Sequence, residues 1–193
     1  FIALGEYIIH PNDNISQNEL LKFTQTDYIK DFPAGYSFAG VRLFSALFAW
    51  LSAIIFFYIL YFVSKNPHTS LLFSSLYIFE NALITHSRAA MLEGSHLFFI
   101  LLAVLYFAYL AQKLSKKTLF NYFVLGILVG LAISIKATGA ITAFLFPFLF
   151  FTDYKYQGST LILKRTLDIA KKFISKGLFF TIGSVAIFSL VWY

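Results

Sequence analysis

Long apolar runs separated by short polar connections occupy the chain from Phe38 to Tyr193, and the charges fall at the ends of these runs. About 20 apolar residues cross the hydrocarbon core of a bilayer as a helix. By this measure the sequence contains six candidate membrane spans, at about 37–64, 70–87, 89–112, 119–135, 137–152 and 177–193. The pattern therefore predicts an all-α fold, a polytopic transmembrane helical bundle with about six spans in this chain.

The composition agrees with a membrane environment. Hydrophobic residues make up 59% of the chain and charged residues 12%, whereas soluble domains average about 25% charged residues. The chain has no cysteine, which excludes disulfides and thiolate metal sites within it. We expect an internal piece of a longer protein, because the chain begins with Phe1 and stops inside an apolar run at Tyr193.

The basic residues predict how the bundle is oriented. Ten of the 15 Lys and Arg residues lie in the connections 65–68, 113–118 and 153–176, and with alternating spans the other five fall on the opposite side: Lys22, Lys30, Arg42, Arg88 and Lys136. The positive-inside rule places the larger group in the cytoplasm. Nucleic acid is not an expected partner, because its binding needs cations gathered on one soluble face.

Two regions follow from this orientation. Residues 1–36 form an outer or lumenal loop with interfacial helices, one of them starting at the capping box Ser16-Gln-Asn-Glu19. Residues 37–193 form the transmembrane bundle, with a basic cytoplasmic helix over about 160–176 that is attracted to anionic membrane lipid. Within the fourth run, Gly126-x-x-x-Gly130 favours the close approach of a neighbouring helix.

Isolated charges within or beside the spans are the first candidate functional residues. Glu80 lies in a stretch otherwise free of charge, and a carboxylate there is functional, paired or protonated inside the bundle. Arg42 lies about one turn inside a span, where a cation either snorkels to the interface or pairs. Lys136 ends an uncharged span as an interface anchor, or joins Arg42 and Arg88 in a phosphate site, since clusters of cations bind phosphate.

The densest polar cluster lies between the second and third runs and contains His86, Arg88, Glu93 and His96. Glu93-x-x-His96 matches the Glu-x-x-His ligand pair of di-iron bundles. That chemistry needs a second such pair and two further carboxylates, and the sequence offers neither, so we expect no metal. The alternative interpretation of the cluster is a polar hairpin that only hydrates the outer surface.

Four strings, in order and spacing, resemble the N-terminal half of the dolichyl-phosphate-mannose protein O-mannosyltransferases, membrane glycosyltransferases of the GT-C class. They are Phe1-Ile-Ala-Leu-Gly-Glu-Tyr-Ile8, Val41-Arg-Leu-Phe-Ser-Ala-Leu-Phe48, Glu80-Asn-Ala-Leu-Ile-Thr-His-Ser-Arg88 followed by Met91-Leu-Glu93, and the segment Gly126 to Gly139 that ends in Ser-Ile-Lys-Ala-Thr-Gly. The first is similar to the segment that follows the family's His-Pro-Pro-Leu-x-Lys motif.

The resemblance implies transfer of a mannose-like hexose, with inversion, from a polyprenyl-phosphate sugar to a protein Ser or Thr hydroxyl. The reaction would take place on the outer or lumenal face of a bacterial plasma membrane or the endoplasmic reticulum, without a cofactor. By motif match, Arg42, Arg88 and Lys136 would hold the donor phosphate, and Glu80, His86, Glu93 and His96 would support the site. The general-base carboxylate is expected before Phe1.

Two departures from the family pattern leave the donor and acceptor open. Ala137 follows Lys136 where family members often have Trp, and Glu93 stands where they usually have Asp. Relatives that modify lipid A or arabinan fit as well, and a lipid or glycan could be the acceptor. A transporter and a membrane scaffold subunit are alternatives from other classes. Transporters tend to show broken helices and inverted repeats near the midplane, whereas here the polar residues cluster at one face and no repeat appears, which favours the enzyme.

Overall fold

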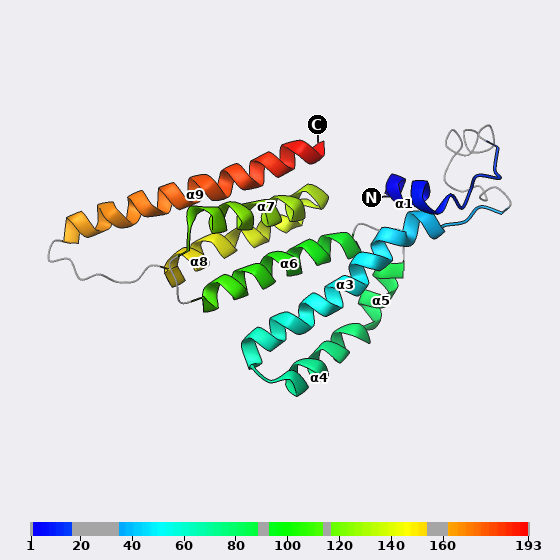
Figure 1. Cartoon of the computed structure of the whole chain (residues 1–193), viewed down its shortest axis with the longest axis horizontal. Coiled ribbons are helices and arrows are strands. Elements are labelled where there is room, and N and C mark those ends of the chain that lie inside the picture. Colours follow the sequence, from blue (N-terminus) through cyan, green and yellow to red (C-terminus); the bar gives the residue numbers. More distant parts are fainter. Residues whose placement is uncertain (1, 17–34, 89–92, 114–116, 154–161, 193) are drawn as a thin grey trace.

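The computed structural model describes residues 2–16, 35–88, 93–113, 117–153 and 162–192, and every regular element within them is a helix (Figure 1). The all-α prediction is confirmed. The helix predicted after Ser16 lies outside the described residues. The elements in chain order are α1 (Ile2–Ile9), α3 (Ala39–Ser64), α4 (Pro67–Ile78), α5 (Asn81–Arg88), α6 (Glu93–Gln112), α7 (Leu119–Ile135), the 3₁₀-helix η1 (Ala137–Phe144), α8 (Leu145–Asp153) and α9 (Ile162–Trp192).

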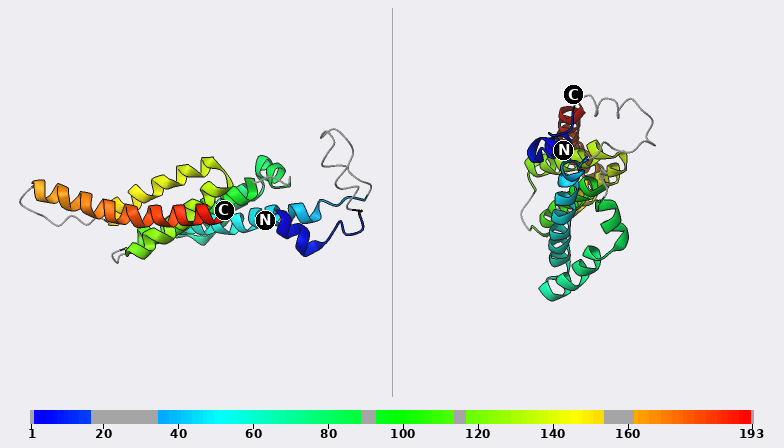
Figure 2. Two further views of the ribbon diagram at one scale, coloured as in Figure 1. Left: turned by 90° about the horizontal axis from the view of Figure 1, so that it is seen from above. Right: turned by 90° about the vertical axis from the view of Figure 1, so that its right-hand side faces the viewer.

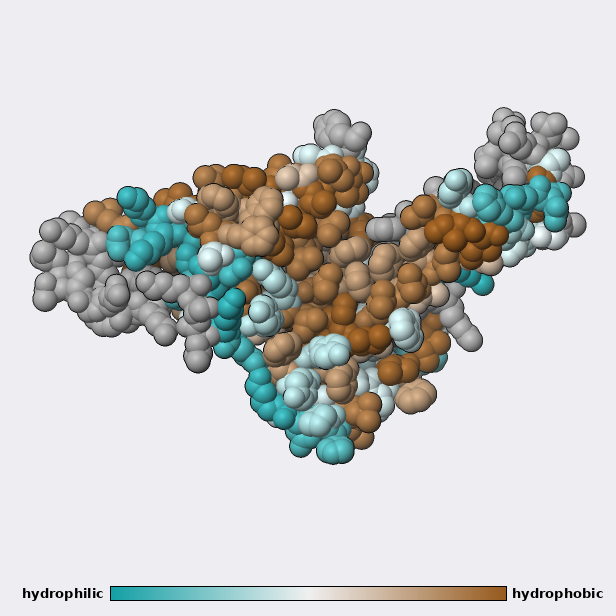
Figure 3. Space-filling model, viewed as in Figure 1, coloured by the Kyte–Doolittle hydropathy of each residue, from teal (hydrophilic) through white to brown (hydrophobic). Residues whose placement is uncertain are grey.

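Three of the helices are long and apolar enough to cross a membrane: α3, α6 and the Thr166–Trp192 part of α9. The apolar segments Leu119–Ile135 and Ala137–Asp153 are shorter. Apolar side chains cover most of the face shown in Figure 3, and hydrophilic residues gather toward its ends. These features confirm a helical membrane bundle, while a count of six spans stays a prediction.

The second apolar run is two helices rather than one. α4 ends at Ile78 and α5 begins at Asn81, and the exposed Glu80 lies between them. Its Oε2 accepts a hydrogen bond of 2.7 Å from the backbone N–H of Leu83. The first N–H groups of a helix have no partner within the helix, so the carboxylate that interrupts the run also caps the helix that follows it.

The last predicted span and the basic segment before it form one helix. α9 continues from Ile162 to Trp192 without a break at residue 176. Its exposed N-terminal half carries the ion pair between Lys172 and Asp168, whose nitrogen and oxygen are 3.2 Å apart. α9 lies along the length of the molecule beside α7 (Figure 2), so the polar and apolar parts of this helix share one axis.

α7 is the central helix of the larger cluster of apolar side chains. Tyr122, Leu125 and Val129 on α7 are fully buried, and they pack with side chains from three neighbouring helices: Ala103 and Leu110 of α6, Phe146 and Leu149 of α8, and Phe180 of α9. α7 thus contacts the core side chains of α6, α8 and α9, and these three helices pack around it.

Glycines bring the backbones of α7 and α9 into contact. A Cβ atom added at Gly126 would lie 2.0 Å from the carbonyl oxygen of Phe180, and one at Gly183 would lie 2.3 Å from that of Phe123. A Cβ at Gly130 would lie 2.5 Å from the carbonyl oxygen of Ser184. No side chain fits at these positions without moving one helix, which confirms the close approach predicted from Gly126-x-x-x-Gly130.

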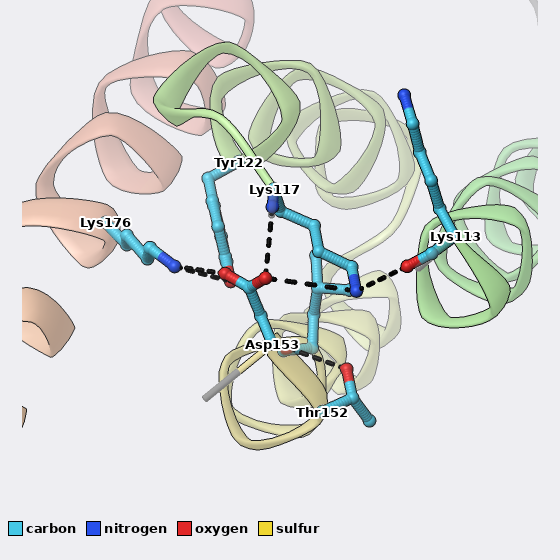
Figure 4. A network of polar contacts seen from close by, with 7 residues as sticks. Lys113, Lys117, Tyr122, Thr152, Asp153 and Lys176 are labelled. Carbon is cyan, nitrogen blue, oxygen red and sulfur yellow. Dashed lines mark hydrogen bonds and ion pairs between the residues drawn. The ribbon is translucent and has the colours of Figure 1, made fainter. Parts of the chain in front are cut away.

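A buried polar network joins α7, α8 and α9 at one end of the bundle (Figure 4). Asp153 at the end of α8 accepts hydrogen bonds from the backbone N–H of Lys117 (3.0 Å), from the Tyr122 hydroxyl (3.3 Å) and from the Lys176 ammonium. The Lys117 ammonium donates to the Lys113 carbonyl at 3.0 Å and lies 3.9 Å from Asp153 Oδ1. Only 5% of the Asp153 and Lys117 side chains and 19% of the Lys176 side chain are exposed.

The ends of α3 and α6 are joined at the same end of the bundle. Lys65 donates to Gln112 Oε1, and Gln112 Nε2 donates to the carbonyl of Phe62. The connections predicted to be cytoplasmic therefore contribute residues to one end of the molecule, while the starts of α3 and α6 and the end of α7 lie at the other (Figure 1).

The glycine contact predicts a position-dependent effect of adding one methyl group. Gly126→Ala should lower the free energy of unfolding by about 1–3 kcal/mol, because overpacking forces the backbones apart. Gly177→Ala is the matched control, since its Cβ would meet only the tip of the Phe146 ring at 3.3 Å. Thermal unfolding of the full-length protein in detergent measures both. Equal melting temperatures for the two variants would contradict the backbone contact.

The Asp153 network predicts a large loss of stability when its carboxylate is removed. Asp153→Asn leaves two largely buried ammonium groups without a countercharge, and breaking such a pair costs about 3–5 kcal/mol. Asp168→Asn removes an exposed pair on α9, whose contribution is about 0.2–1 kcal/mol. Thermal unfolding should rank Asp153→Asn far below both Asp168→Asn and the unmodified protein, and the reverse order would show that Asp153 does not hold these helices together.

Candidate functional site

An ion pair joins α6 to the turn after α7 at the end of the bundle opposite Asp153. Glu93 is the first residue of α6, and Lys136 separates α7 from η1. The Lys136 ammonium lies 3.1 Å from Glu93 Oε1, with 48% and 39% of the two side chains exposed. The pair is open to solvent, so a ligand could compete for either partner.

A second contact lies one helical turn along α6. His96 Nε2 and the Thr138 hydroxyl of η1 are 3.0 Å apart, and the tautomer of the ring decides which of them donates. The other ring nitrogen, Nδ1, is buried and makes no well-formed hydrogen bond, although the Ala132 carbonyl lies close by. Together with the Glu93–Lys136 pair, this contact fixes the start of α6 against the turn.

The backbone explains why Lys136 projects from this turn. Its dihedral angles, φ −153° and ψ 134°, are extended and end α7. The backbone N–H of Gly139 then donates to the Lys136 carbonyl at 2.8 Å. A Cβ at Gly139 would lie 2.5 Å from the Ala132 carbonyl, so the chain folds back directly against α7. The ammonium therefore extends from a tightly packed turn rather than from a loose loop.

Arg42 lies at the same end, outside the ion pair. A Cβ at Gly94 would lie 2.8 Å from the Ser45 carbonyl, so the start of α6 packs directly on α3 about one turn below Arg42. The exposed Arg42 guanidinium lies over the Phe38 ring, with 5.0 Å between its carbon and the ring centroid. This is the geometry of a cation–π contact, and it keeps the cation at the surface.

The structure brings together three of the seven residues predicted for the site, namely Glu93, His96 and Lys136. Glu80 caps α5 instead of joining them. The backbones of His86 and Arg88 belong to α5, and their side chains lie outside the described part of the structure. Their predicted roles stay predictions.

Thr138 and Glu6 are additional polar residues at this end. Thr138 contacts His96. In the sequence, only the position of Thr138 two residues after Lys136 could have indicated that it belongs to this site. Glu6 on α1 accepts a hydrogen bond from Asn12 at 3.2 Å through Oε2, and its buried Oε1 has no hydrogen-bond partner among the described residues. α1 packs tightly on α3 there, because a Cβ at Gly5 would lie 2.1 Å from the Gly40 carbonyl. Glu6 is the only charged residue in the apolar segment 1–9, which is the signal that could have indicated it.

The Asp153 network was also missed by sequence reasoning. Asp153 is the only acidic residue between Glu93 and Asp168, at the end of a span on the lysine-rich side, and that isolation was the available signal. At neither end do the described residues bring three His, Asp or Glu side chains together in a way that could hold a metal ion. The end opposite Asp153 offers a paired cation and carboxylate, Lys136 and Glu93, beside a tightly packed turn.

Comparison with known proteins identifies the family. The family model for dolichyl-phosphate-mannose-protein mannosyltransferase matches residues 20–193. A curated relative, dolichyl-phosphate-mannose–protein mannosyltransferase 5 of Candida albicans (strain SC5314), is 31% identical over 121 residues, which is 61% of this chain and 17% of the relative. No solved structure matches. The chain spans about a sixth of that relative's length, and it belongs to the dolichyl-phosphate-mannose-protein mannosyltransferase family.

Proposed function

We propose that the whole protein is a membrane glycosyltransferase that moves a mannose-like hexose from a polyprenyl-phosphate sugar to a protein Ser or Thr hydroxyl. The observation that carries the proposal is the half-exposed Glu93–Lys136 pair on a rigid turn, inside the segment that matches the family model. The name of the Candida albicans relative supports a phosphate-linked mannose donor and a protein acceptor. That relative comes from a fungus, which favours the endoplasmic reticulum over a bacterial plasma membrane.

Lys136 stabilises the leaving group in this proposal. When the bond between the sugar C1 and the phosphate oxygen breaks, the phosphodiester becomes a phosphate monoester and gains one negative charge. A fixed ammonium at the point where charge develops lowers the barrier. Glu93 balances Lys136 before the donor binds, and the phosphate then competes with this carboxylate for the ammonium. Arg42, exposed at the same end, adds positive potential for the lipid phosphate.

The acceptor hydroxyl needs a base, since an alcohol is a weak nucleophile at neutral pH. Glu93 is engaged with Lys136, so we do not assign it that role. In this proposal the base lies before Phe1, an expectation that rests on the family resemblance. Attack by the hydroxyl on the face opposite the phosphate gives inversion at C1, and the hydroxyl proton passes to that base.

Loss of the Lys136 charge should impair transfer. Lys136→Gln preserves most of the side-chain length but removes a charged hydrogen bond to phosphate of about 1.5–3 kcal/mol, so kcat/KM should fall by roughly ten- to a hundredfold. Mannosyl transfer to a Ser/Thr peptide by the full-length protein in nanodiscs measures this. Lys172→Gln is the matched control, because Lys172 is an exposed lysine on α9. Unchanged kcat/KM in a folded Lys136→Gln protein would leave Lys136 an interface anchor only.

The orientation of the bundle can be tested by cysteine labelling. This chain has no cysteine, and Ala140 and Thr118 are exposed at opposite ends. A membrane-impermeant maleimide applied from the lumenal side should label Ala140→Cys and leave Thr118→Cys unlabelled until the membrane is permeabilised. Ser95 at the start of α6 is buried and therefore unsuitable as a labelling position. Labelling of Thr118→Cys alone from the lumenal side would reverse the proposed orientation.

A further inference from the structure

The side of α9 that faces away from the bundle carries a stripe of long, exposed side chains. α9 runs along one edge of the molecule beside α7 (Figure 1). Six of its residues are spaced three or four positions apart, so they lie on one side of the helix. All six side chains are exposed, and we call them the α9 stripe: Leu167, Lys171, Ile174, Leu178, Ile182 and Val185.

The α9 stripe is not built to bind another helix. Membrane helices associate where small residues let their backbones approach, and α9 uses Gly183 for this on the side that packs on α7. The α9 stripe has no glycine, alanine or serine. A second copy of the chain fits poorly as well, because a two-fold axis along the membrane normal sets each residue near its own counterpart. Two Lys171 ammonium groups would then repel each other.

Lys171 is the one charged residue of the α9 stripe, and it makes no ion pair with a described residue. The acidic residues of α8 and α9 are already engaged. Asp168 pairs with Lys172 at 3.2 Å, and Asp153 accepts from Lys176. An ammonium group that lies among apolar side chains without a countercharge attracts an anion from its surroundings. The α9 stripe therefore presents one free cation on an apolar surface.

The position of Lys171 along α9 matches the head-group layer of a bilayer. Residues 177–192 carry no charge, and Lys176 just before them is held by the Asp153 network. With the edge of the hydrocarbon core at Gly177, the Lys171 backbone lies about 9 Å beyond that edge. The head-group layer is about 5–8 Å thick on each side, and a lysine side chain is long enough to reach it. Leu178, like the stripe residues after it, then lies beside lipid acyl chains.

We propose that the α9 stripe binds an anionic phospholipid of the cytoplasmic leaflet, with the head-group phosphate on Lys171 and an acyl chain along Leu178 and Ile182. The proposal rests on the proposed orientation of the bundle and does not depend on mannosyl transfer. An ammonium and a phosphate form a charged hydrogen bond, and the cytoplasmic leaflet is the anionic one. The bound lipid fixes the depth of α9 in the membrane, and the glycine contact with α7 passes that depth on to the bundle.

Photolabelling of the full-length protein in phosphatidylcholine nanodiscs tests the lipid preference. The probes are phosphatidylglycerol and phosphatidylcholine, each with the same diazirine at the start of one acyl chain, and labelled peptides are identified by mass spectrometry. On peptides from residues 167–185 the anionic probe should label roughly fivefold more than the neutral one, since one lysine near an anionic surface contributes about 1 kcal/mol. A ratio near one overturns the proposal. Absence of label from these peptides, as when another segment of the protein covers the α9 stripe, overturns it too.

Charge variants separate a defined site from general attraction to a basic protein. Lys171→Gln should bring the labelling ratio on these peptides close to one, and Lys171→Arg should keep it, because arginine also binds phosphate. Lys113→Gln is the matched control: Lys113 is exposed at the same end and points away from Asp153 (Figure 4), so the variant has the same net charge. It should keep the ratio. An equal fall in Lys171→Gln and Lys113→Gln would show general attraction only and overturn the site.

Free phosphate is the other source of the same chemistry. Inorganic phosphate is added to the labelling reaction, and sodium chloride at equal ionic strength serves as the reference, because salt alone weakens interactions between exposed charges. The two salts should lower the labelling ratio equally, since inorganic phosphate has no acyl chain to lie along the α9 stripe. A ratio that falls to one in phosphate but not in chloride would make Lys171 a site for soluble anions and overturn lipid binding.

Discussion

The bilayer removes the force that normally packs helices together. Lipid chains are as apolar as leucine, so membrane helices associate through close van der Waals contact and satisfied polar groups rather than by leaving water. In this chain α7 is held by both kinds of interaction, close backbone contact and paired polar groups. Gly126 and Gly183 allow carbonyl oxygens of the facing helix to approach within the space of a methyl group, and Asp153 ties α7, α8 and α9 through one carboxylate. These contacts hold α8 and α9 against α7.

The two ends of the bundle use the same chemistry for different purposes. At one end Asp153 is 5% exposed and accepts hydrogen bonds from Lys117, Tyr122 and Lys176, so nothing else can reach it without separating the helices. At the opposite end Glu93 is 39% exposed, and its Oε1 lies 3.1 Å from the Lys136 ammonium. A buried network fixes structure, whereas a half-exposed pair can exchange one partner for a ligand. Exposure, more than the kind of residue, distinguishes the candidate site from the structural one.

The sequence predicts the features that follow from local patterns of residues. Apolar runs predict the helices, and the Gly126 and Gly130 spacing predicts the contact with α9, because each is a local pattern. It does not predict the break at Glu80, since a carboxylate in an apolar run fits a buried pair as well as a helix cap. The contacts of Asp153 join residues 23–36 positions apart, and the contact between His96 and Thr138 joins residues 42 positions apart. Such pairings follow from how helices meet rather than from any one segment.

The turn after α7 shows how a small local difference shapes the candidate site. Ala137 and Thr138 are both exposed, and Gly139 lies against α7. The family often has Trp where this chain has Ala137, and an indole there would cover part of the surface beside Lys136. With alanine, the ammonium pairs with Glu93, and 48% of the Lys136 side chain remains exposed. The longer side chain of Glu93, compared with the usual Asp, lets its carboxylate extend one methylene further toward the turn. The two departures are therefore complementary: one opens the surface around the cation, and the other supplies the carboxylate that neutralises it.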